Sequence, residues 1–399
     1  MRVRSVIVVV LALLLGAEVQ PPARAAQRVA RVVSTSGIPH HDVGNYTRSS
    51  FWRRGDPRGI PDSRTWRGTI DHVLGSLAAE RADAYLHTGD MVSGRWGVDR
   101  DRPKAGIFGP TGTLAQRRAA VERAGNLYYR QNKSWWARNG IPAGSVHFGM
   151  GDHEYGNTNA DGRPRSHQLA FVPRFRDVWR RHFVDGRGYR YRLDSGQQRH
   201  GSYATVLPGG VGLVTLDPIL VDGGLMRARI GSAQERWLRD VLADMEVRGI
   251  DFVVVQVEIP PRGPNRAFHS GRQTLDNGAA LWDLLDARDV DLVLSAEWHD
   301  VTMRSDGGST PVQVVHGSQL YQARANYLVI DFFDDGSIEV VAKAMTGTRD
   351  TSTKLWAPDL LRAPNEVRVR ARPAVVGRLG IAPDGAVIRD TGRLAEYGG

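Results

Sequence analysis

The stretch FGMGDHEYGN, residues 148–157, places an acid, a histidine and a second acid in a row: Asp152, His153 and Glu154. Carboxylate and imidazole side chains are the groups with which proteins bind metal ions and transfer protons. Further residues of these types follow other short apolar runs of the chain: Asp90, Glu258, Glu297 and His299. One such turn alone carries little information, so the inference depends on whether these turns meet in space.

Each of these turns follows a short apolar segment that we predict to be a β-strand. The four segments read AYLHTGD, SVHFGMGDHE, DFVVVQVEIPP and VDLVLSAEWHD, and helical stretches separate them, for example near residues 69–81. Strands that alternate with helices predict a layered α/β fold. In open α/β sheets the carboxyl ends of the strands meet at one crevice, so we expect the acidic turns to share a site.

The amino terminus, MRVRSVIVVVLALLLGAEVQPPARAAQ, has the layout of a secretory signal peptide. Arg2 and Arg4 precede an apolar run, and small residues follow at Ala23 and Ala25. We predict a signal peptide over residues 1–25 and a secreted or extracytoplasmic protein, with an uncleaved anchor as the alternative. The apolar run is shorter than a comfortable membrane span, so we expect no stable membrane insertion after cleavage.

The chain contains no cysteine, so any metal ion must be held by oxygen or imidazole ligands. Export without cysteine suits a bacterial envelope or medium. The formal net charge of +10 comes mostly from arginine, because the only lysines are Lys104, Lys133, Lys343 and Lys354. This skew indicates a base-composition bias, and no basic stripe interleaved with aromatic residues recurs, so we expect no specific nucleic-acid partner.

In their order along the chain, these segments resemble the motifs of the calcineurin-like metallophosphoesterases. HTGDMV is similar to the family's Gly-Asp motif, GMGDHEYG to its Gly-Asn-His-Glu motif, VVVQVEIPP to its lone His before a proline, and LSAEWHD to its Gly-His-any-His motif. The resemblance runs from about residue 31 to residue 345. It implies a four-layer α/β/β/α sandwich of two mixed β-sheets, with a two-metal centre that hydrolyses phosphate esters at the strand ends.

We expect the domain that carries this resemblance to cover residues 26–350, with an inserted segment near residues 163–199 and a C-terminal extension at residues 351–399. The inserted segment is rich in arginine and aromatic residues, and the composition turns to Arg, Pro and Gly from about residue 350. Four arginines of the inserted segment could bind a phosphate or pair with acids: Arg174, Arg176, Arg180 and Arg181.

Several of the family's metal ligands are replaced in this chain. The first motif, within RVVSTSGIPHHD, has Ser34 and Ser36 where the family has Asp and His. The other replacements put acids in place of an amide and two imidazoles: Asp152, Glu258 (or Gln256 at that motif) and Glu297. The residues that keep the family's types are Asp90, His153, Glu154 and His299.

Carried over by position, one family metal site would contain the two serines, Asp90 and His299. The other would contain carboxylates only: Asp90, Asp152, Glu258 and Glu297. Carboxylates that converge in a partly dry crevice need a cation, protons or arginine partners, and oxygen ligands favour Mg, Mn or Ca over Zn or Fe. We therefore predict one hard divalent ion at the second site and weak or no occupancy of the first, unless His40, His41 and Asp42 restore it.

The resemblance implies that His153 stabilises or protonates the leaving oxygen of a phosphate ester, with Glu154 orienting the backbone or the ring of the histidine. We predict a secreted metal-dependent hydrolase that acts on a phosphate-containing small molecule or ester. One hard ion lowers the pKa of water less than a two-metal centre does, so its hydrolysis should be slower or more alkaline. The alternative is a noncatalytic protein that keeps the fold and binds a cation or ligand in an acidic crevice.

Overall fold

The computed structural model describes residues 25–37, 64–92, 108–156, 166–194, 201–263, 274–307, 311–317, 323–354 and 365–395, together with residues 94, 96, 98 and 320. Residues 1–24 of the expected signal peptide lie outside this part, as do His40, His41 and Asp42. Among the described residues, no helix combines the length and the apolar character that crossing a membrane requires.

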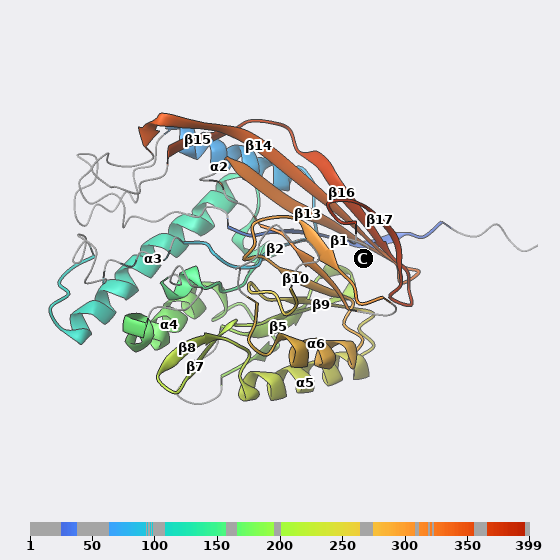
Figure 1. The fold of residues 1–399 in the computed structure, drawn as a ribbon, viewed down its shortest axis with the longest axis horizontal. Helices are drawn as coiled ribbons and strands as arrows, with labels where there is room; N and C mark the ends of the chain where they lie inside the picture. Colours follow the sequence, from blue (N-terminus) through green and yellow to red (C-terminus); the bar gives the residue numbers. More distant parts are fainter. Residues whose placement is uncertain are drawn as a thin grey trace, which may run out of the picture.

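Two large β-sheets form the centre of the molecule (Figure 1). The first sheet has the order β17 (Val387–Gly392), β16 (Ala374–Ile381), β14 (Ile338–Lys354), β13 (Arg324–Phe333), β1 (Arg28–Thr35), β2 (Ala84–His87) and β3 (Val146–Phe148), with β15 (Asn365–Val369) paired to β14. The second has the order β11 (Thr302–Arg304), β12 (Val312–Val315), β10 (Leu292–Ser295), β9 (Phe252–Gln256), β6 (Val211–Thr215), β5 (Tyr203–Val206) and β4 (Tyr191–Arg192). A small hairpin joins β7 (Ile219–Asp222) to β8 (Leu225–Ala228).

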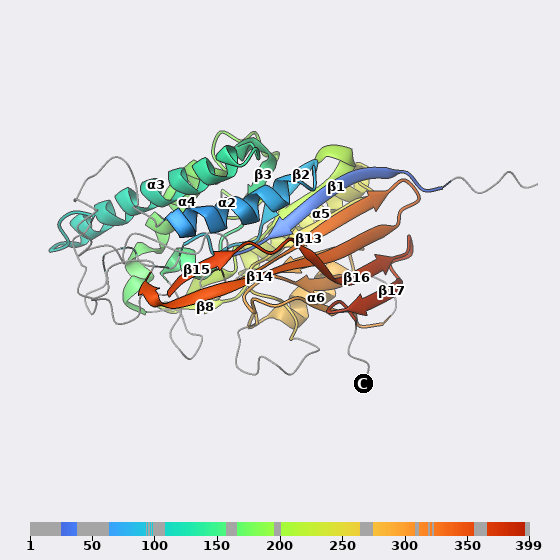
Figure 2. The same ribbon diagram turned by 90° about the horizontal axis from the view of Figure 1, so that it is seen from above.

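Both large sheets are mixed, and they pack face to face with helices on their outer sides (Figures 1 and 2). Apolar side chains from both sheets share one buried cluster, which includes Val32 and Leu86 from the first sheet and Val254 and Leu294 from the second. The helices are α2 (Arg64–Ala78), α3 (Leu114–Arg138), α4 (Val172–Phe183), α5 (Ser232–Val247) and α6 (Gly278–Asp286). In Figure 1, α2 and α3 lie on one side of the sheets and α5 and α6 on the other. The predicted α/β/β/α sandwich is confirmed.

The parallel strands of each sheet end at the same level, which brings their loops together. In the first sheet β1, β2 and β3 are parallel, and His87 is paired with both Thr35 and Phe148. In the second sheet β6, β9, β10 and β12 are parallel, with Gln256 opposite Thr215 and Leu294. Every residue of β9 is buried, because helices cover one face of this sheet and the first sheet covers the other.

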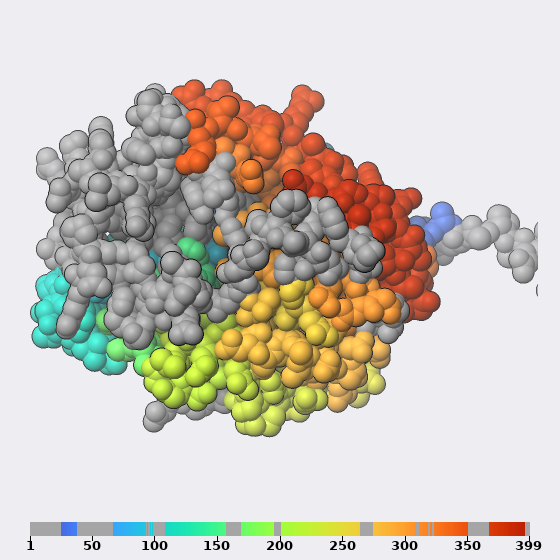
Figure 3. Space-filling view, viewed as in Figure 1, coloured from blue at the N-terminus to red at the C-terminus, as the bar shows by residue number. Residues whose placement is uncertain are grey.

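The C-terminal strands belong to the first sheet. β14 continues through residue 350, where we expected the domain to end, and β16 pairs with it along most of its first half. In Figure 3 the described C-terminal strands form one continuous red surface at the side of the molecule. Within the expected insertion, α4 packs on α3, and β4 adds an edge strand to the second sheet.

Candidate metal centre

Four carboxylates from four different turns meet at the strand ends. One carboxylate oxygen from each of Asp90, Asp152, Glu258 and Glu297 lies within 4.8 Å of the others. The first two residues follow β2 and β3 of the first sheet, and the last two follow β9 and β10 of the second. The side chains of Asp90, Asp152 and Glu258 are buried, and Glu297 is half-buried. The site therefore lies between the two sheets, as the strand-end positions of these residues predicted.

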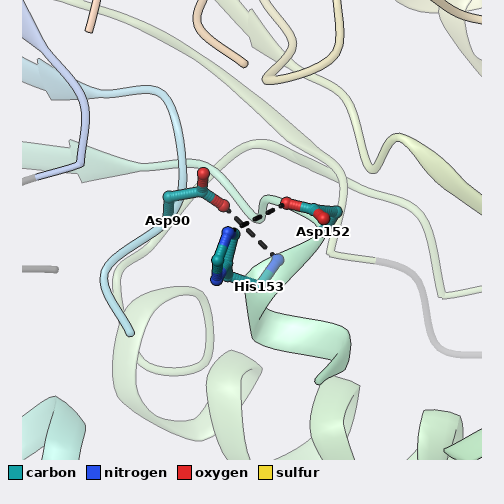
Figure 4. A group of neighbouring side chains, drawn as sticks. All are labelled: Asp90, Asp152 and His153. Carbon is teal, nitrogen blue, oxygen red and sulfur yellow. Dashed lines mark hydrogen bonds and ion pairs between the residues drawn. The ribbon is translucent and has the colours of Figure 1, made fainter. Parts of the chain in front are cut away.

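His153 lies beside two of these acids, at the start of a short 3₁₀ turn, His153–Tyr155 (Figure 4). Together with Asp90 and Asp152 it forms a second group with metal-ligand spacing. Its backbone N–H donates to Oδ1 of Asp90 at 3.4 Å, and its Nε2 lies 3.9 Å from Oδ1 of Asp152. The side chain of His153 is 15% exposed, so the imidazole is the more accessible part of an otherwise buried group.

Glu154 contacts backbone N–H groups on both sides of the site. Its carboxylate accepts three backbone hydrogen bonds, from the N–H groups of Asp90 (3.0 Å), Met91 (2.8 Å) and Gly151 (2.7 Å). These bonds join the loop after β2 to the turn after β3. Of the two targets that we considered, the backbone or the ring of His153, these contacts involve backbone, and the fully buried carboxylate joins the two turns that carry Asp90 and Asp152.

Burial and mutual repulsion raise the pKa values of the central acids. Burial and then the charge of Asp152 raise the pKa of Asp90 well above its ordinary value. The pKa of Glu258 is likewise raised well above its usual range, by burial first and then by the charge of Asp90. Burial raises the pKa of Glu154 to about 7, although its three backbone hydrogen bonds oppose this change. The group therefore disfavours its own ionisation and would be stabilised by a cation.

The backbone at the site combines two strained acidic residues with two closely packed glycines. Asp90 and Glu297 have φ angles of 61° and 45°, in the left-handed region that costs a non-glycine residue about 1–3 kcal/mol. A Cβ atom on Gly151 would lie 2.2 Å from Oδ1 of Asp90, and one on Gly89 would lie 2.7 Å from Cγ of Glu258. Only glycine permits the two turns to approach the carboxylates so closely.

The residues at the family's first metal site form other contacts. Oγ of Ser34 and Nε2 of His316 are hydrogen-bonded at 2.8 Å, and the hydroxyl of Ser36 donates to the carbonyl of Gly89 at 2.9 Å. Burial lowers the pKa of His316 to about 3, so this imidazole is neutral. His299 is half-buried and belongs to neither carboxylate group found among the described residues. No motif pointed to His316, which becomes significant only because it faces the serine.

The four arginines that we singled out near residues 163–199 contact carboxylates. Arg174 and Arg181 both pair with Glu122 of α3, at 3.1 and 2.8 Å. Arg176 pairs with Asp217, and Arg180 pairs with acids that include Asp194. Both of the latter arginines are almost completely buried. Of the two roles that we considered for these side chains, the structure supports pairing with acids.

The side chains at the site are suited to a hard divalent ion. Oδ2 of Asp90 and Oε2 of Glu258 are buried and accept no hydrogen bond from the described residues, which leaves two carboxyl oxygens for a ligand. Every ligand atom of the four-carboxylate group is oxygen, the donor preferred by Mg, Mn and Ca. These four residues could hold such an ion, and His153 could contribute an imidazole at its side.

No family model and no curated protein sequence matches this chain. Solved structures do match in a search by fold, and among them is a dimetal phosphatase from Danio rerio, with 13% identity and a TM-score of 0.46 over 80% of this chain and 96% of the other. A purple acid phosphatase from yellow lupin seeds has 13% identity and a TM-score of 0.41 over 88% of this chain and 55% of its own. A calcineurin-like phosphoesterase from Bacillus subtilis has 12% identity and a TM-score of 0.37 over 87% and 92%.

These similar proteins are thus a dimetal phosphatase, a purple acid phosphatase and a calcineurin-like phosphoesterase. Their identities and TM-scores are too low to transfer an activity. Any conclusion about the chemistry of this chain has to come from its own residues. The feature of the chain that most directly indicates its chemistry is the four-carboxylate group between the sheets.

Proposed function

We propose that this chain is a secreted, metal-dependent hydrolase of phosphate esters that uses one hard divalent ion. The observation that carries the proposal is the convergence of Asp90, Asp152, Glu258 and Glu297, whose oxygens lie within 4.8 Å of one another. The raised pKa values of Asp90 and Glu258 support it, because a divalent cation would remove the repulsion that burial imposes. We propose Mg, Mn or Ca as the ion.

A single ion is supported by the contacts at the family's first site. Ser34 and Ser36 bond to His316 and to the carbonyl of Gly89, so neither hydroxyl replaces the anionic ligand or the imidazole of that site. His316 is neutral and buried, so it adds no negative charge to this region, where Asp90 is the one carboxylate that the resemblance carries over. We therefore propose that the second ion of the two-metal centre has been lost.

The proposed chemistry divides between the ion and two kinds of side chain. When bound, the ion would supply the positive charge that draws a phosphate ester to the site and stabilises charge on its oxygens. The four carboxylates hold the ion, and Glu154 fixes the separation of their turns. His153, the partly exposed imidazole, would donate a proton to the leaving oxygen of the ester.

The alternative function is cation binding without catalysis. It is favoured by the altered first site, because a carboxylate cage can bind a cation with no water-activating partner. The two functions differ in what His153 does. A catalytic imidazole is required for turnover but contributes less to metal affinity than the carboxylates, whereas a binding protein has no turnover to lose.

The test uses the mature chain, residues 26–399, with Mg, Mn, Ca and Zn titrated by calorimetry and hydrolysis of bis- and mono-nitrophenyl phosphate measured with each. We expect one ion of Mn or Mg per chain, binding lost in Asp90→Asn, and turnover lost in both Asp90→Asn and His153→Gln. Glu246→Gln removes a surface carboxylate that is 74% exposed and is the matched control.

Binding without turnover would support the noncatalytic alternative. Absence of binding by every ion, or turnover that survives both site variants, would refute the proposal.

A further inference from the structure

A buried network connects the candidate metal centre to the inserted helix α4. It contains Tyr155, Arg176 and Asp217, each at most 1% exposed. The Tyr155 hydroxyl donates to Oδ2 of Asp217 at 2.7 Å, and Nε of Arg176 donates both to that oxygen and to the tyrosine hydroxyl, each at 2.8 Å. The Arg176 guanidinium also lies 5.5 Å from the centre of the Tyr155 ring. The three side chains therefore form a closed triangle.

Asp217 is the fixed corner of this triangle. It follows β6 of the second sheet, and its carboxylate also accepts the backbone N–H groups of Gly201 (3.0 Å) and Ile219 (3.1 Å). Its own backbone N–H donates to Oε1 of Gln234 at 2.9 Å, and its carbonyl accepts from Nε2 of the same glutamine at 3.0 Å. These backbone contacts hold the Asp217 carboxylate in place, and Tyr155 and Arg176 are oriented by it.

Tyr155 is the last residue of the turn that carries the candidate site residues. The turn has a second attachment, because Glu154 accepts the N–H groups of the loop that contains Asp90. One attachment ties the turn to the first sheet and the other ties it to the second sheet and α4. Asp152 and His153 lie just before these two attachments, so their positions depend on both.

Stability alone is a weak explanation for this network. Burial of a full ion pair costs solvation free energy that an apolar replacement would avoid, and such pairs often contribute no net stability. Burial acts to lower the pKa of Arg176, but the charge of Asp217, the neighbouring Tyr155 and the hydrogen bonds to both together outweigh it, so the pKa is raised and the arginine stays cationic. A buried, ionised and fully bonded triangle is well suited to fixing geometry.

We infer that Tyr155, Arg176 and Asp217 are positioning residues, which hold Asp152 and His153 in the arrangement that binds the metal ion. The inserted segment then helps to hold the site residues in place. The inference rests on the proposed function, because its main readout is metal affinity. Residues that orient metal ligands through a second layer of contacts change affinity by roughly 10-fold or more when they are removed.

The experiment compares variants that disturb the triangle with variants that remove similar groups elsewhere. Tyr155→Phe removes only the hydroxyl, and its control is Tyr327→Phe, because Tyr327 is also buried and donates to a carboxylate, that of Glu80, at 2.6 Å. Arg176→Met removes a buried arginine of α4, and its control is Arg180→Met, one turn along the same helix.

For each variant of the full mature chain, Mn²⁺ affinity is measured by calorimetry, and the spectrum of bound Mn²⁺ is recorded by electron paramagnetic resonance. The stability of each chelated protein is measured in a separate unfolding experiment. We expect Tyr155→Phe and Arg176→Met to weaken Mn²⁺ binding by roughly 10-fold and to change the spectrum. The two controls should destabilise the chelated protein to a similar degree but keep the wild-type affinity and spectrum.

Equal losses of affinity in the variants and their controls would overturn the inference, because loosening of the whole domain would then explain them. Unchanged affinity in both triangle variants would overturn it as well, while the proposed function would stand. If the wild-type protein binds none of the divalent ions, the proposed function fails first, and the inference fails with it. The wild-type titration therefore separates the two failures.

Discussion

Replacement of Glu258 by glutamine should stabilise the metal-free protein and weaken metal binding at the same time. Glu258→Gln keeps the shape of the side chain and an oxygen that can accept the backbone N–H of Glu297, which Glu258 now accepts at 3.0 Å. It removes one of four carboxylates whose oxygens lie within 4.8 Å of one another. The same change therefore relieves repulsion in the empty site and removes a ligand from the filled one.

The size of the effect follows from two limits. Two ionised carboxylates 4.8 Å apart repel each other by about 3 kcal/mol at an effective dielectric constant near 20. Protonation of Glu258 would remove this repulsion, but at pH 7.5 it costs about 4 kcal/mol for a carboxyl group with an ordinary pKa of 4.5. We therefore expect the variant to gain about 3 kcal/mol when metal is chelated. With an unfolding entropy of about 2.1 cal/mol/K per residue over 399 residues, Tm should rise by about 4 °C.

The assay is thermal unfolding of wild type, Glu258→Gln and the surface control Glu246→Gln, each in chelator and in excess Mn²⁺. Mn²⁺ at 100 times its Kd should stabilise the wild type by about 2.7 kcal/mol and the variant by much less. The stability difference of about 3 kcal/mol between the variant and the wild type should therefore shrink strongly on addition of Mn²⁺. A lower Tm for Glu258→Gln in chelator, or an equal response of both proteins to Mn²⁺, would refute the electrostatic reasoning.

Two further predictions concern pH and Glu154. In the folded protein the pKa values of Asp90 and Glu258 are raised, and that of Glu154 is about 7. The stability that protonation of these acids provides is therefore full below their unfolded pKa values, near 4, and is lost as the pH rises through their folded pKa values. The chelated protein should thus become more stable as the pH falls from about 8 to 5, whereas saturating Mn²⁺ should reduce this dependence of stability on pH. The same pH dependence with and without Mn²⁺ would contradict the assignment of these acids to a metal site. Glu154→Gln should lower stability by about 2 kcal/mol in urea titrations, because an amide NH₂ would face a backbone N–H group; an unchanged midpoint would argue against the role we assign to this carboxylate.

Much of the architecture could be predicted from the sequence because it is encoded locally. The buried strands are short apolar runs such as FVVVQ, and each ends at a glycine, proline or acid that can begin a turn. Parallel strands place their ends on one side of a sheet, so the sequence alone was enough to group Asp90, Asp152, Glu258 and Glu297.

Other features depended on contacts between distant segments. The partner of Ser34 is His316, and Arg176 meets Asp217 across the sheet and helix layers. The pairing of β16 and β17 with β14, which continues through residue 350, likewise joins segments whose composition gave no sign of a shared sheet. Such pairings leave no periodic signal in the chain, because each residue contributes only one side of a contact.

The sequence by itself therefore determined the residue types at each strand end and the layered fold that gathers them. The tertiary structure decided which groups meet: Glu154 faces backbone N–H groups, and the arginines of α4 face acids. The physical reason is that hydrophobic periodicity depends on neighbours a few residues away, whereas the direction of a buried polar side chain is set by the hydrogen-bond partner that the packed fold brings to it.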